Sequence, residues 1–368
     1  MKKIIFVIPS LGGGGAERVF ATLLSEISLD EFEVILAIGI NEGPFLSLVP
    51  KNIRIVELGG CKKSSRSFMP LLRLIYKVKP DIVFSTLGMV STSALCSLFI
   101  GRKTRFIARF GNTLSADLDR AKRESFLRYV LQKLSYKLVL LNSEIIAQSD
   151  YMKRDIVEYF SYKKSNLIHV IHNPAPSPTL TSKNHTDNEY TKLVTVGRFA
   201  WQKGYDILLE ALKKVIDRGY KIDFSFIGDG IDKQLLVGIV NRLGINTSIS
   251  FLGFKNEPFQ FAKDADIFIS SSRFEGFSNV IVESLANGIP VVATDCPSGN
   301  REIIIEGENG WLASVEGDRV ENLANTIILA INSRNAIDMI SESKKILAKF
   351  SMDSFVRKYE RVFNKEVL

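Results

Sequence analysis

Short apolar runs alternate with helical segments along this 368-residue chain, and one polar stretch divides the alternation into two halves. In the front half, the runs that we predict to be strands are Ile4–Ile8, Val34–Ile40, Ile53–Val56, Asp81–Thr86, Arg105–Arg109, Leu138–Leu141 and Leu167–Ile171. In the back half, they are Leu193–Val196, Phe224–Ile227, Ile249–Leu252, Ile267–Ser270 and Pro290–Ala293. Continuous apolar strands separated by helices are typical of parallel sheets with both faces covered. The sequence therefore predicts an α/β protein with two doubly wound, Rossmann-like domains.

The stretch between the halves has the composition of a linker, because residues 173–190 contain three prolines and almost no apolar side chains. We predict an N-terminal domain over residues 1–172, this linker, a C-terminal domain over 191–352 and a final helix over 353–368. Doubly wound sheets bind ligands at the carboxyl ends of their strands, so we expect the active site in a cleft between the two domains.

Positive charge is concentrated in the front half, where residues 1–172 carry 25 Lys and Arg against 15 Asp and Glu. From Arg120 to Tyr136, basic residues are mixed with aromatic and aliphatic ones, which suits an anionic membrane surface. A solvated helix face over an ordinary core is the alternative. No apolar run approaches the roughly 20 residues of a membrane span, and no nucleic-acid-binding motif is present. Three cysteines are too few for a disulfide framework, which favours a reducing compartment.

A glycine-rich loop, Gly12–Gly15, joins the first predicted strand to the first helix. Its glycines allow the backbone to approach a phosphate closely, and the helix N-terminus adds partial positive charge. The spacing is not G-x-G-x-x-G and no acidic residue closes the second strand, which disfavours a nicotinamide cofactor. A tight turn without a ligand is the alternative.

A second turn, GRFAWQKG, follows the first strand of the back half and places Arg198 and Lys203 five residues apart. Two cations so placed can converge on one diphosphate, where each charge-assisted contact contributes roughly 1.5–3 kcal/mol. When a bond to a leaving diphosphate breaks, negative charge develops that fixed cations stabilise. Surface charge unrelated to a ligand is the alternative.

Residues 271–290, SSRFEGFSNVIVESLANGIP, contain two glutamates eight residues apart. Apolar residues recur at helical spacing in this segment, so we predict a helix that begins near Ser278 or Asn279 and offers its free N–H groups to an anion. Glu275 precedes that anion site, and Glu283 lies one turn past Asn279 on the same side. Carboxylates accept hydrogen bonds from sugar hydroxyls. The arrangement suits a sugar nucleotide, which has hydroxyls at both ends and a diphosphate between them.

The E-x7-E spacing within EGFSNVIVESLANGIPVVAT, together with GGGGAER, VGRFAWQKG and IGDG, resembles the retaining glycosyltransferases of family 4, which have the GT-B fold. The resemblance covers nearly the whole chain and implies that the last helix crosses back onto the N-terminal domain. It makes Glu275, Arg198 and Lys203 the catalytic residues, with Glu275 on the transferred sugar and the two cations on the leaving phosphates. Glu283 would bind the ribose hydroxyls of a donor that the family leads us to expect to be UDP-linked. The other donor contacts that it implies are Gly14, Gly15, Gly197, Gly228, Phe254, Gly276, Phe277, Ser278, Asn279 and Val280.

The acceptor side departs from the family pattern. Many relatives have a histidine where this sequence has Phe110, whereas Asn112 matches. We therefore expect no histidine base, and a front-face mechanism in which the departing phosphate takes the proton of the acceptor. Arg109 and Asn112 are the acceptor-side candidates.

Two D-x-D pairs, Asp117/Asp119 and Asp264/Asp266, have the spacing that binds metal in other glycosyltransferases. We interpret both as surface residues, because the first lies in a charged helix and the second between a helix and an apolar strand. Two cations and a helix terminus can neutralise the phosphates, so we expect neither metal nor cofactor. For Asp229 of IGDG, we favour a helix cap.

The sequence thus predicts a retaining, metal-independent glycosyltransferase that moves a hexose or an N-acetylhexosamine from a UDP-linked donor. The expected acceptor is a polyprenyl-diphosphate glycan or another lipid-linked glycan of surface polysaccharide or glycoconjugate biosynthesis. We expect a cytoplasmic protein, peripheral on the cytoplasmic face of the inner membrane, whose basic N-terminal domain contacts anionic lipid. Two alternatives stay open: a sugar-nucleotide epimerase on the same fold, and a catalytically inactive relative that acts as a binding protein.

Overall fold

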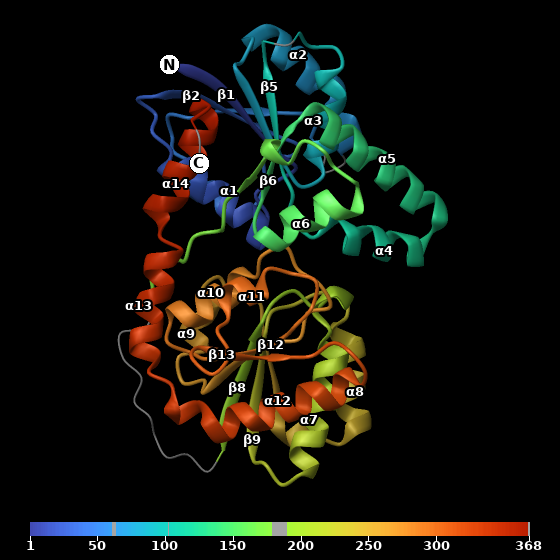
Figure 1. Ribbon diagram of the computed structural model, residues 1–368, viewed down its shortest axis with the longest axis vertical. Coiled ribbons are helices and arrows are strands. Elements are labelled where there is room, and N and C mark those ends of the chain that lie inside the picture. Colours follow the sequence, from blue (N-terminus) through green and yellow to red (C-terminus); the bar gives the residue numbers. More distant parts are fainter. Residues whose placement is uncertain (61–63, 102, 179–189, 367–368) are drawn as a thin grey trace. The chain divides into compact units, whose positions relative to one another are not determined.

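The computed structural model describes residues 1–60, 64–101, 103–178 and 190–366. The chain forms two compact units, each built on one parallel sheet (Figure 1). The first unit comprises Met1–Pro174 and the C-terminal segment from Met352, and the second comprises Ala175–Ser351. Most of the predicted linker, residues 179–189, lies outside the described residues.

The first unit has a seven-stranded sheet in the order β3-β2-β1-β4-β5-β6-β7, and every neighbouring pair is parallel. Its central strands are apolar and buried, as expected where helices cover both faces. The strands are β1 Lys2–Ile8, β2 Phe32–Ile38, β3 Arg54–Glu57, β4 Ile82–Thr86, β5 Arg105–Arg109, β6 Glu144–Ala147 and β7 Ile168–Val170. The helices are α1 Gly15–Glu26, α2 Phe68–Val78, α3 Met89–Ser97, α4 Leu114–Glu124, α5 Phe126–Asn142, α6 Asp150–Tyr159 and α14 Met352–Asn364.

The second unit has a six-stranded parallel sheet in the order β10-β9-β8-β11-β12-β13. Its strands are β8 Thr191–Val196, β9 Ile222–Ile227, β10 Ile249–Gly253, β11 Ile267–Ser270, β12 Val291–Thr294 and β13 Gly310–Ala313. Its helices are α7 Tyr205–Asp217, α8 Lys233–Leu243, α9 Pro258–Phe261, α10 Asn279–Ala286, α11 Asn300–Ile303, α12 Arg319–Ser333 and α13 Met339–Lys349. The predicted fold class, two Rossmann-like parallel sheets, is confirmed. None of the helices in the described ranges is both long enough and apolar enough to cross a membrane.

One predicted strand is wrong. Residues Leu138–Leu141 form the last turn of α5, and the sheet strand β6 begins only at Glu144. A four-residue apolar run fits a strand and a buried helix turn equally well, and here the helix continues through it with Val139 and Leu140 buried. The short edge strand β13 was not predicted from the sequence.

Helix α14 belongs to the core of the first unit. The ring of Phe363 has its centroid 5.5 Å from that of Phe84 and 6.0 Å from those of Phe6 and Phe32. Arg105 on β5 donates a hydrogen bond of 3.0 Å to the carbonyl oxygen of Phe363. The last helix is therefore fixed to the first sheet by buried rings and by a cation at its C-terminal end, where the helix dipole favours positive charge.

Candidate active site

Several residues predicted to bind a donor gather at one edge of the second sheet. Strand β8 lies between β9 and β11, and all three are parallel, so their carboxyl ends share this edge. Chain order reverses at β8, and ligands of doubly wound sheets bind at such a point. Gly197 and Gly228 directly follow β8 and β9, and the exposed Phe254 follows β10.

The glycine turns lie close together at this edge. The backbone N–H of Gly197 donates to the carbonyl of Ile227 at 3.0 Å, and that of Gly228 donates to the carbonyl of Gly253 at 2.9 Å. Gly228 has φ +148°, and a Cβ there would lie 1.9 Å from the carbonyl oxygen of Gly197. Only glycine fits this position, so the two turns can pack closely against each other.

The central feature of the site is an ion pair between Lys203 and Glu275. Lys203 Nζ donates to Glu275 Oε1 at 2.7 Å, and the hydroxyl of Ser272 donates to the same oxygen at 2.7 Å. The residue Glu275 is only 8% exposed. Burial alone would lower the pKa of Lys203, but the negative charge of Glu275 raises it above the ordinary value. Lys203 is therefore a fixed cation. Glu275 is a carboxylate held in place by three donors, because Gln202 Nε2 also donates to its Oε2 at 3.5 Å.

Two backbone segments bring this pair together, the short helical turn Trp201–Lys203 and the loop after β11. Gln202 Nε2 donates to the carbonyl of Phe274 at 3.1 Å, and Ser271 Oγ donates to the carbonyl of Lys203 at 2.8 Å. Gly204, with φ +63°, allows the carbonyl oxygen of Ser271 to approach, because a Cβ there would lie 2.2 Å from it. Residues that are 67 to 73 positions apart in the sequence thus contact one another and hold the turn against the loop.

Helix α10 begins where the sequence predicted, at Asn279, with Ser278 as its N-cap. The hydroxyl of Ser278 does not cap the helix; it is buried and has no hydrogen-bond partner within the described part of the chain. Glu283 is half-buried on the fifth residue of α10, and Val280, on its first turn, is also half-buried. The helix therefore places its N-terminus a few residues after Glu275.

The backbone between Glu275 and α10 is held by neighbouring loops. The N–H of Gly299 donates to the carbonyl of Gly276 at 3.1 Å, and the buried ring of Phe277 lies 5.5 Å from that of Phe350. Arg198 is exposed at the same edge, and its positive charge acts to lower the pKa of Lys203.

The expected helix cap at Asp229 is wrong. Its carboxylate accepts from the N–H of Gly230 at 2.8 Å and pairs with Lys233 at 3.2 Å, whereas the N-cap of α8 is Asp232. The helix starts three residues later than a cap at Asp229 requires, because the chain first turns through Gly230.

In the first unit, the glycine-rich loop lies where it was predicted. Gly14 is the N-cap of α1 and Gly15 its first residue, so the loop ends at the N-terminus of a twelve-residue helix.

The acceptor-side candidates lie at and after the end of β5. Arg109 is buried and donates to Asn173 Oδ1 at 2.8 Å. Phe110 is a core residue whose ring lies 5.5 Å from that of Tyr136, and Asn112 follows in a half-buried position. A histidine at position 110 would have to share this apolar packing. The roles predicted for Arg109 and Asn112 at the acceptor stay predictions.

The interpretation of both D-x-D pairs as surface residues is wrong for two of the four residues. Asp117 Oδ2 accepts from the hydroxyl of Tyr136 at 3.2 Å, and its other oxygen lies 3.2 Å from Arg120. Asp266 Oδ2 accepts from the N–H of Lys192 at 2.8 Å. Burial raises the pKa of Asp117 despite these partners. Both carboxylates join neighbouring elements within their own unit.

Sequence reasoning missed Ser272 and Gln202, which support Glu275 and its loop. A signal was present for the serine, because a run of three serines ends an apolar strand and continues past it, and all three are buried in the structure: Ser270, Ser271 and Ser272. Buried hydroxyls need hydrogen-bond partners, and at the carboxyl end of a strand those partners are often site residues.

Two family models together match most of the chain. "Glycosyltransferase Family 4" matches residues 13–176, and "Glycosyl transferases group 1" matches residues 177–346. Among solved structures, Anabaena HepE in complex with UDP-glucose superimposes with a TM-score of 0.79 at 18% identity, covering 99% of this chain and 100% of HepE.

Two curated relatives extend over most of the chain. The N-acetylgalactosamine-N,N'-diacetylbacillosaminyl-diphospho-undecaprenol 4-alpha-N-acetylgalactosaminyltransferase of Campylobacter jejuni is 29% identical over 370 residues, with 96% of each chain covered. The amylovoran biosynthesis glycosyltransferase AmsD of Erwinia amylovora is 26% identical over 330 residues, with 87% of this chain and 88% of AmsD covered. The fold and the matches define a glycosyltransferase, and the chain belongs to glycosyltransferase family 4, with the GT-B fold.

Proposed function

We propose that the chain transfers a hexose or an N-acetylhexosamine from a UDP-linked donor to a lipid-linked glycan, with retention at the anomeric carbon and without a metal ion. The observation that carries this proposal is the contact between Lys203 and Glu275 at the carboxyl edge of the second sheet. It places a cation suited to phosphate beside a carboxylate suited to hydroxyls, and a sugar nucleotide presents both groups. HepE, which shares the fold, has been solved with UDP-glucose.

In this proposal the second unit binds the donor. Arg198 and Lys203 neutralise the diphosphate together with the N–H groups that begin α10, so no metal is needed. Glu275 accepts hydrogen bonds from the transferred sugar, and Glu283 from the ribose. The exposed Phe254 lies beside the base, and Gly14 and Gly15, at the start of α1, are the donor contacts that we propose in the first unit.

The proposed reaction needs no side-chain base. The bond between the anomeric carbon and the β-phosphate oxygen breaks, and the acceptor hydroxyl forms the new bond on the same face of the sugar. The departing phosphate oxygen takes the hydroxyl proton, which suits a site where Phe110 is packed in the core. Arg198 and Lys203 stabilise the negative charge that develops on the diphosphate.

The acceptor class follows from the relatives. The Campylobacter enzyme acts, by its name, on a sugar linked to diphospho-undecaprenol, and AmsD takes part in amylovoran biosynthesis. We place the acceptor on the first unit, near Asn112 and Arg109, with the chain as a peripheral protein on the cytoplasmic face of the membrane that holds such lipids.

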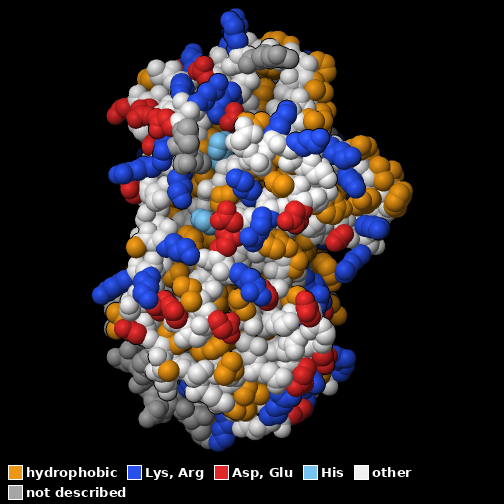
Figure 2. Space-filling model, viewed as in Figure 1, with side chains coloured by type: hydrophobic (Ala, Val, Ile, Leu, Met, Phe, Trp, Pro, Cys, Tyr) orange, Lys and Arg blue, Asp and Glu red, His pale blue; other side chains and the backbone are white. Residues whose placement is uncertain are grey.

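The exposed side chains of helix α5 support the proposal that the protein associates with a membrane. Several of its apolar residues are more than half exposed: Phe126, Leu127, Leu131, Leu134 and Leu141. Basic side chains stand exposed beside them on α4 and α5: Lys122, Arg123, Arg128 and Lys137. Figure 2 shows hydrophobic side chains gathered over the outer end of these helices with blue Lys and Arg around them. Such a surface suits a bilayer with anionic lipids, at about 1 kcal/mol per well-placed cation.

A donor screen tests the proposed chemistry. The protein alone is incubated with UDP-GalNAc, UDP-GlcNAc, UDP-Gal, UDP-Glc and GDP-Man, and the released nucleotide and sugar are analysed. We expect slow hydrolysis of one UDP-sugar, with unchanged activity after treatment with EDTA. Conversion of a UDP-sugar into its epimer would instead indicate an epimerase, and release from none of the donors would argue against the proposal.

Vesicle sedimentation tests the membrane part. The protein is mixed with vesicles of phosphatidylglycerol and phosphatidylcholine, or of phosphatidylcholine alone. We expect binding to the anionic vesicles at low salt and loss of binding in the triple variant Leu127→Gln, Leu131→Gln, Leu134→Gln. A wild-type protein that stays in the supernatant with anionic vesicles would exclude this part.

A further inference from the structure

We infer that Arg273 and Asp206 are positioning residues for the transfer reaction, because their ion pair fixes the position of Lys203 relative to Glu275. The inference rests on the roles proposed above for Lys203 and Glu275, and it adds two residues to which no role in the reaction has been assigned.

The ion pair has the geometry of a strong contact. Arg273 Nη1 donates to Asp206 Oδ1 at 2.9 Å, and Nη2 donates to Oδ2 at 2.7 Å. Two parallel bonds of this kind fix the guanidinium plane as well as its position. The arginine side chain is 13% exposed and the aspartate 42% exposed, so water competes mainly for the carboxylate.

Arg273 also contacts the turn that carries Lys203. Nη1 donates to the carbonyl of Trp201 at 2.7 Å, and the guanidinium carbon lies 4.7 Å from the centre of the indole ring. The backbone N–H of Arg273 donates to the carbonyl of Gln202 at 2.7 Å. Arg273 therefore contacts the turn through its backbone, through hydrogen bonds of its side chain and through stacking.

The two ion pairs connect the same two segments. Asp206 follows Lys203 by three residues, and Arg273 precedes Glu275 by two. The carboxylate of the Arg273–Asp206 pair is partly exposed, whereas the Lys203–Glu275 pair is more deeply buried. The first pair is therefore an outer connection between the turn and the loop, and the second is an inner connection. Removing the outer connection allows the segments to shift against each other, which moves the cation for the phosphate relative to the carboxylate for the sugar.

The expected consequence is a loss of turnover larger than the loss of stability. An ion pair with a half-exposed carboxylate contributes little to folding, whereas a displacement of about 1 Å at a reacting centre can cost up to about a hundredfold in rate. We expect Arg273→Met to lower kcat about ten- to a hundredfold, with a smaller change in the KM of the donor and an intact fold.

The experiment measures kcat and donor KM with the nucleotide sugar that the donor screen selects. The variants are Arg273→Met, Asp206→Asn, their double variant and Arg273→Lys. If both residues act through one contact, the double variant is no slower than the slower single variant. Arg273→Lys keeps the charge but not the two parallel bonds, so its kcat lies between those of the wild type and Arg273→Met.

Tryptophan fluorescence gives a second readout. The chain has two tryptophans, and Trp311 is buried whereas Trp201 is 41% exposed and stacked on Arg273. Acrylamide therefore quenches mainly Trp201. We expect stronger quenching in Arg273→Met, because the ring loses its cover, and no change in Arg218→Met.

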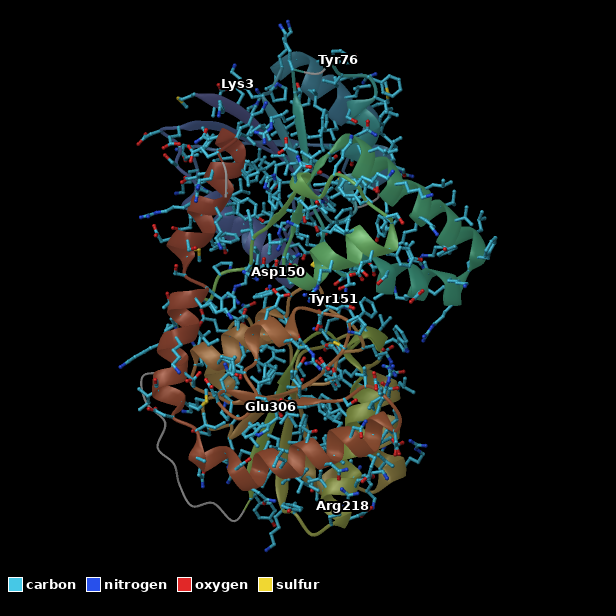
Figure 3. All side chains as sticks on the ribbon, in the orientation of Figure 1. Lys3, Tyr76, Asp150, Tyr151, Arg218 and Glu306 are labelled. Carbon is cyan, nitrogen blue, oxygen red and sulfur yellow. The ribbon has the colours of Figure 1, made fainter. Side chains whose placement is uncertain are left out.

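Arg218→Met is the matched control. Arg218, which is labelled in Figure 3, is the C-cap of α7, roughly 18 Å along the helix from Asp206. It pairs there with Glu321 and donates to Asn325 Oδ1 at 2.7 Å. The Arg218→Met variant removes an arginine of the same unit that has similar partners, and we expect it to keep wild-type kcat.

The outcomes separate this inference from the proposed function. Wild-type kcat and quenching in both Arg273→Met and Asp206→Asn, with Glu275→Ala inactive, would overturn the inference and leave the proposed function in place. A fully active Glu275→Ala would overturn the proposed function itself. If Arg273→Met does not fold, Asp206→Asn and Arg273→Lys still decide, because wild-type kcat in both would exclude a positioning role.

Discussion

Lys203 Nζ lies 2.7 Å from Glu275 Oε1, so the cation proposed for the donor phosphate already contacts the carboxylate proposed for the donor sugar. An ammonium group has three N–H donors, and this contact uses one of them. Two stay available for phosphate oxygens, so a bound donor can share the cation without breaking the pair. The ion pair thus fixes both side chains before the donor arrives, and catalysis benefits from groups that need no reorganisation during the reaction.

Glu275→Ala should abolish transfer while the protein stays folded. The variant removes the acceptor of the sugar hydroxyls and leaves Lys203 without its buried partner, so we expect kcat to fall at least about a hundredfold. Activity is measured as UDP release, and folding by circular dichroism. Glu321→Ala, on the outer helix α12, is the control and should keep wild-type kcat. Transfer at wild-type rate by Glu275→Ala would remove Glu275 from the site.

Lys203→Ala should weaken donor binding and turnover together. A charge-assisted contact to phosphate is worth about 1.5–3 kcal/mol, so kcat/KM should fall roughly 10- to 150-fold. Because the same cation stabilises the leaving diphosphate, kcat should fall as well as KM rise. Steady-state kinetics and calorimetric titration with UDP give both parts. A rise in KM with unchanged kcat would show that Lys203 only binds.

Much of the fold could be predicted because its signals are local. Each central strand is a continuous apolar run, and the start of α10 follows from Ser278 and Asn279 before an apolar helical repeat. Leu138–Leu141 could not be assigned, because the run is short and only its packing shows that α5 continues through it. The period of apolar residues does not distinguish a four-residue strand from one buried helical turn.

The residues of the candidate site also differ in how far the sequence could predict them. Glu275 and Lys203 stand out as charged residues in turns after apolar strands, and so the sequence alone indicated them. Asp206 was not indicated, because a charged residue on the first turn of a helix is common. Arg273 lies in the same loop as Glu275, but its partner is 67 residues away in the sequence. Pairings over such distances depend on the sheet order, which sets which turns meet at the carboxyl edge.

Phe363→Ala should destabilise the first unit strongly. The ring is fully buried in α14 and contacts the rings of Phe6, Phe32 and Phe84. Loss of such a side chain leaves a cavity and costs about 3–5 kcal/mol. Urea unfolding followed by circular dichroism measures the change. Phe126→Ala, on the exposed face of α5, is the control and should change stability by less than about 0.5 kcal/mol. Equal effects of the two variants would mean that α14 is not part of the core.

Glu144 should make the stability of the first unit depend on acid pH. Its carboxylate accepts hydrogen bonds of 2.8 and 2.7 Å from Arg105, and His169 Nε2 lies 3.5 Å from it. Burial alone would raise the pKa of Glu144, but His169 and Arg105 lower it from 4.5 to about 2. The folded pKa is below the unfolded one, so the contribution is complete above about pH 4.5 and is lost as the pH falls towards 2.

Glu144→Gln should therefore lower the free energy of unfolding by about 1–3 kcal/mol near neutral pH, and the difference from the wild type should shrink steadily below about pH 4.5. Urea unfolding at a series of pH values measures both effects. Arg105→Met removes the partner and should reduce the acid dependence in the same way, although it also loses the hydrogen bond to α14. A difference between the wild type and Glu144→Gln that stays constant across the pH series would show that the stabilising contact does not depend on the charge of Glu144.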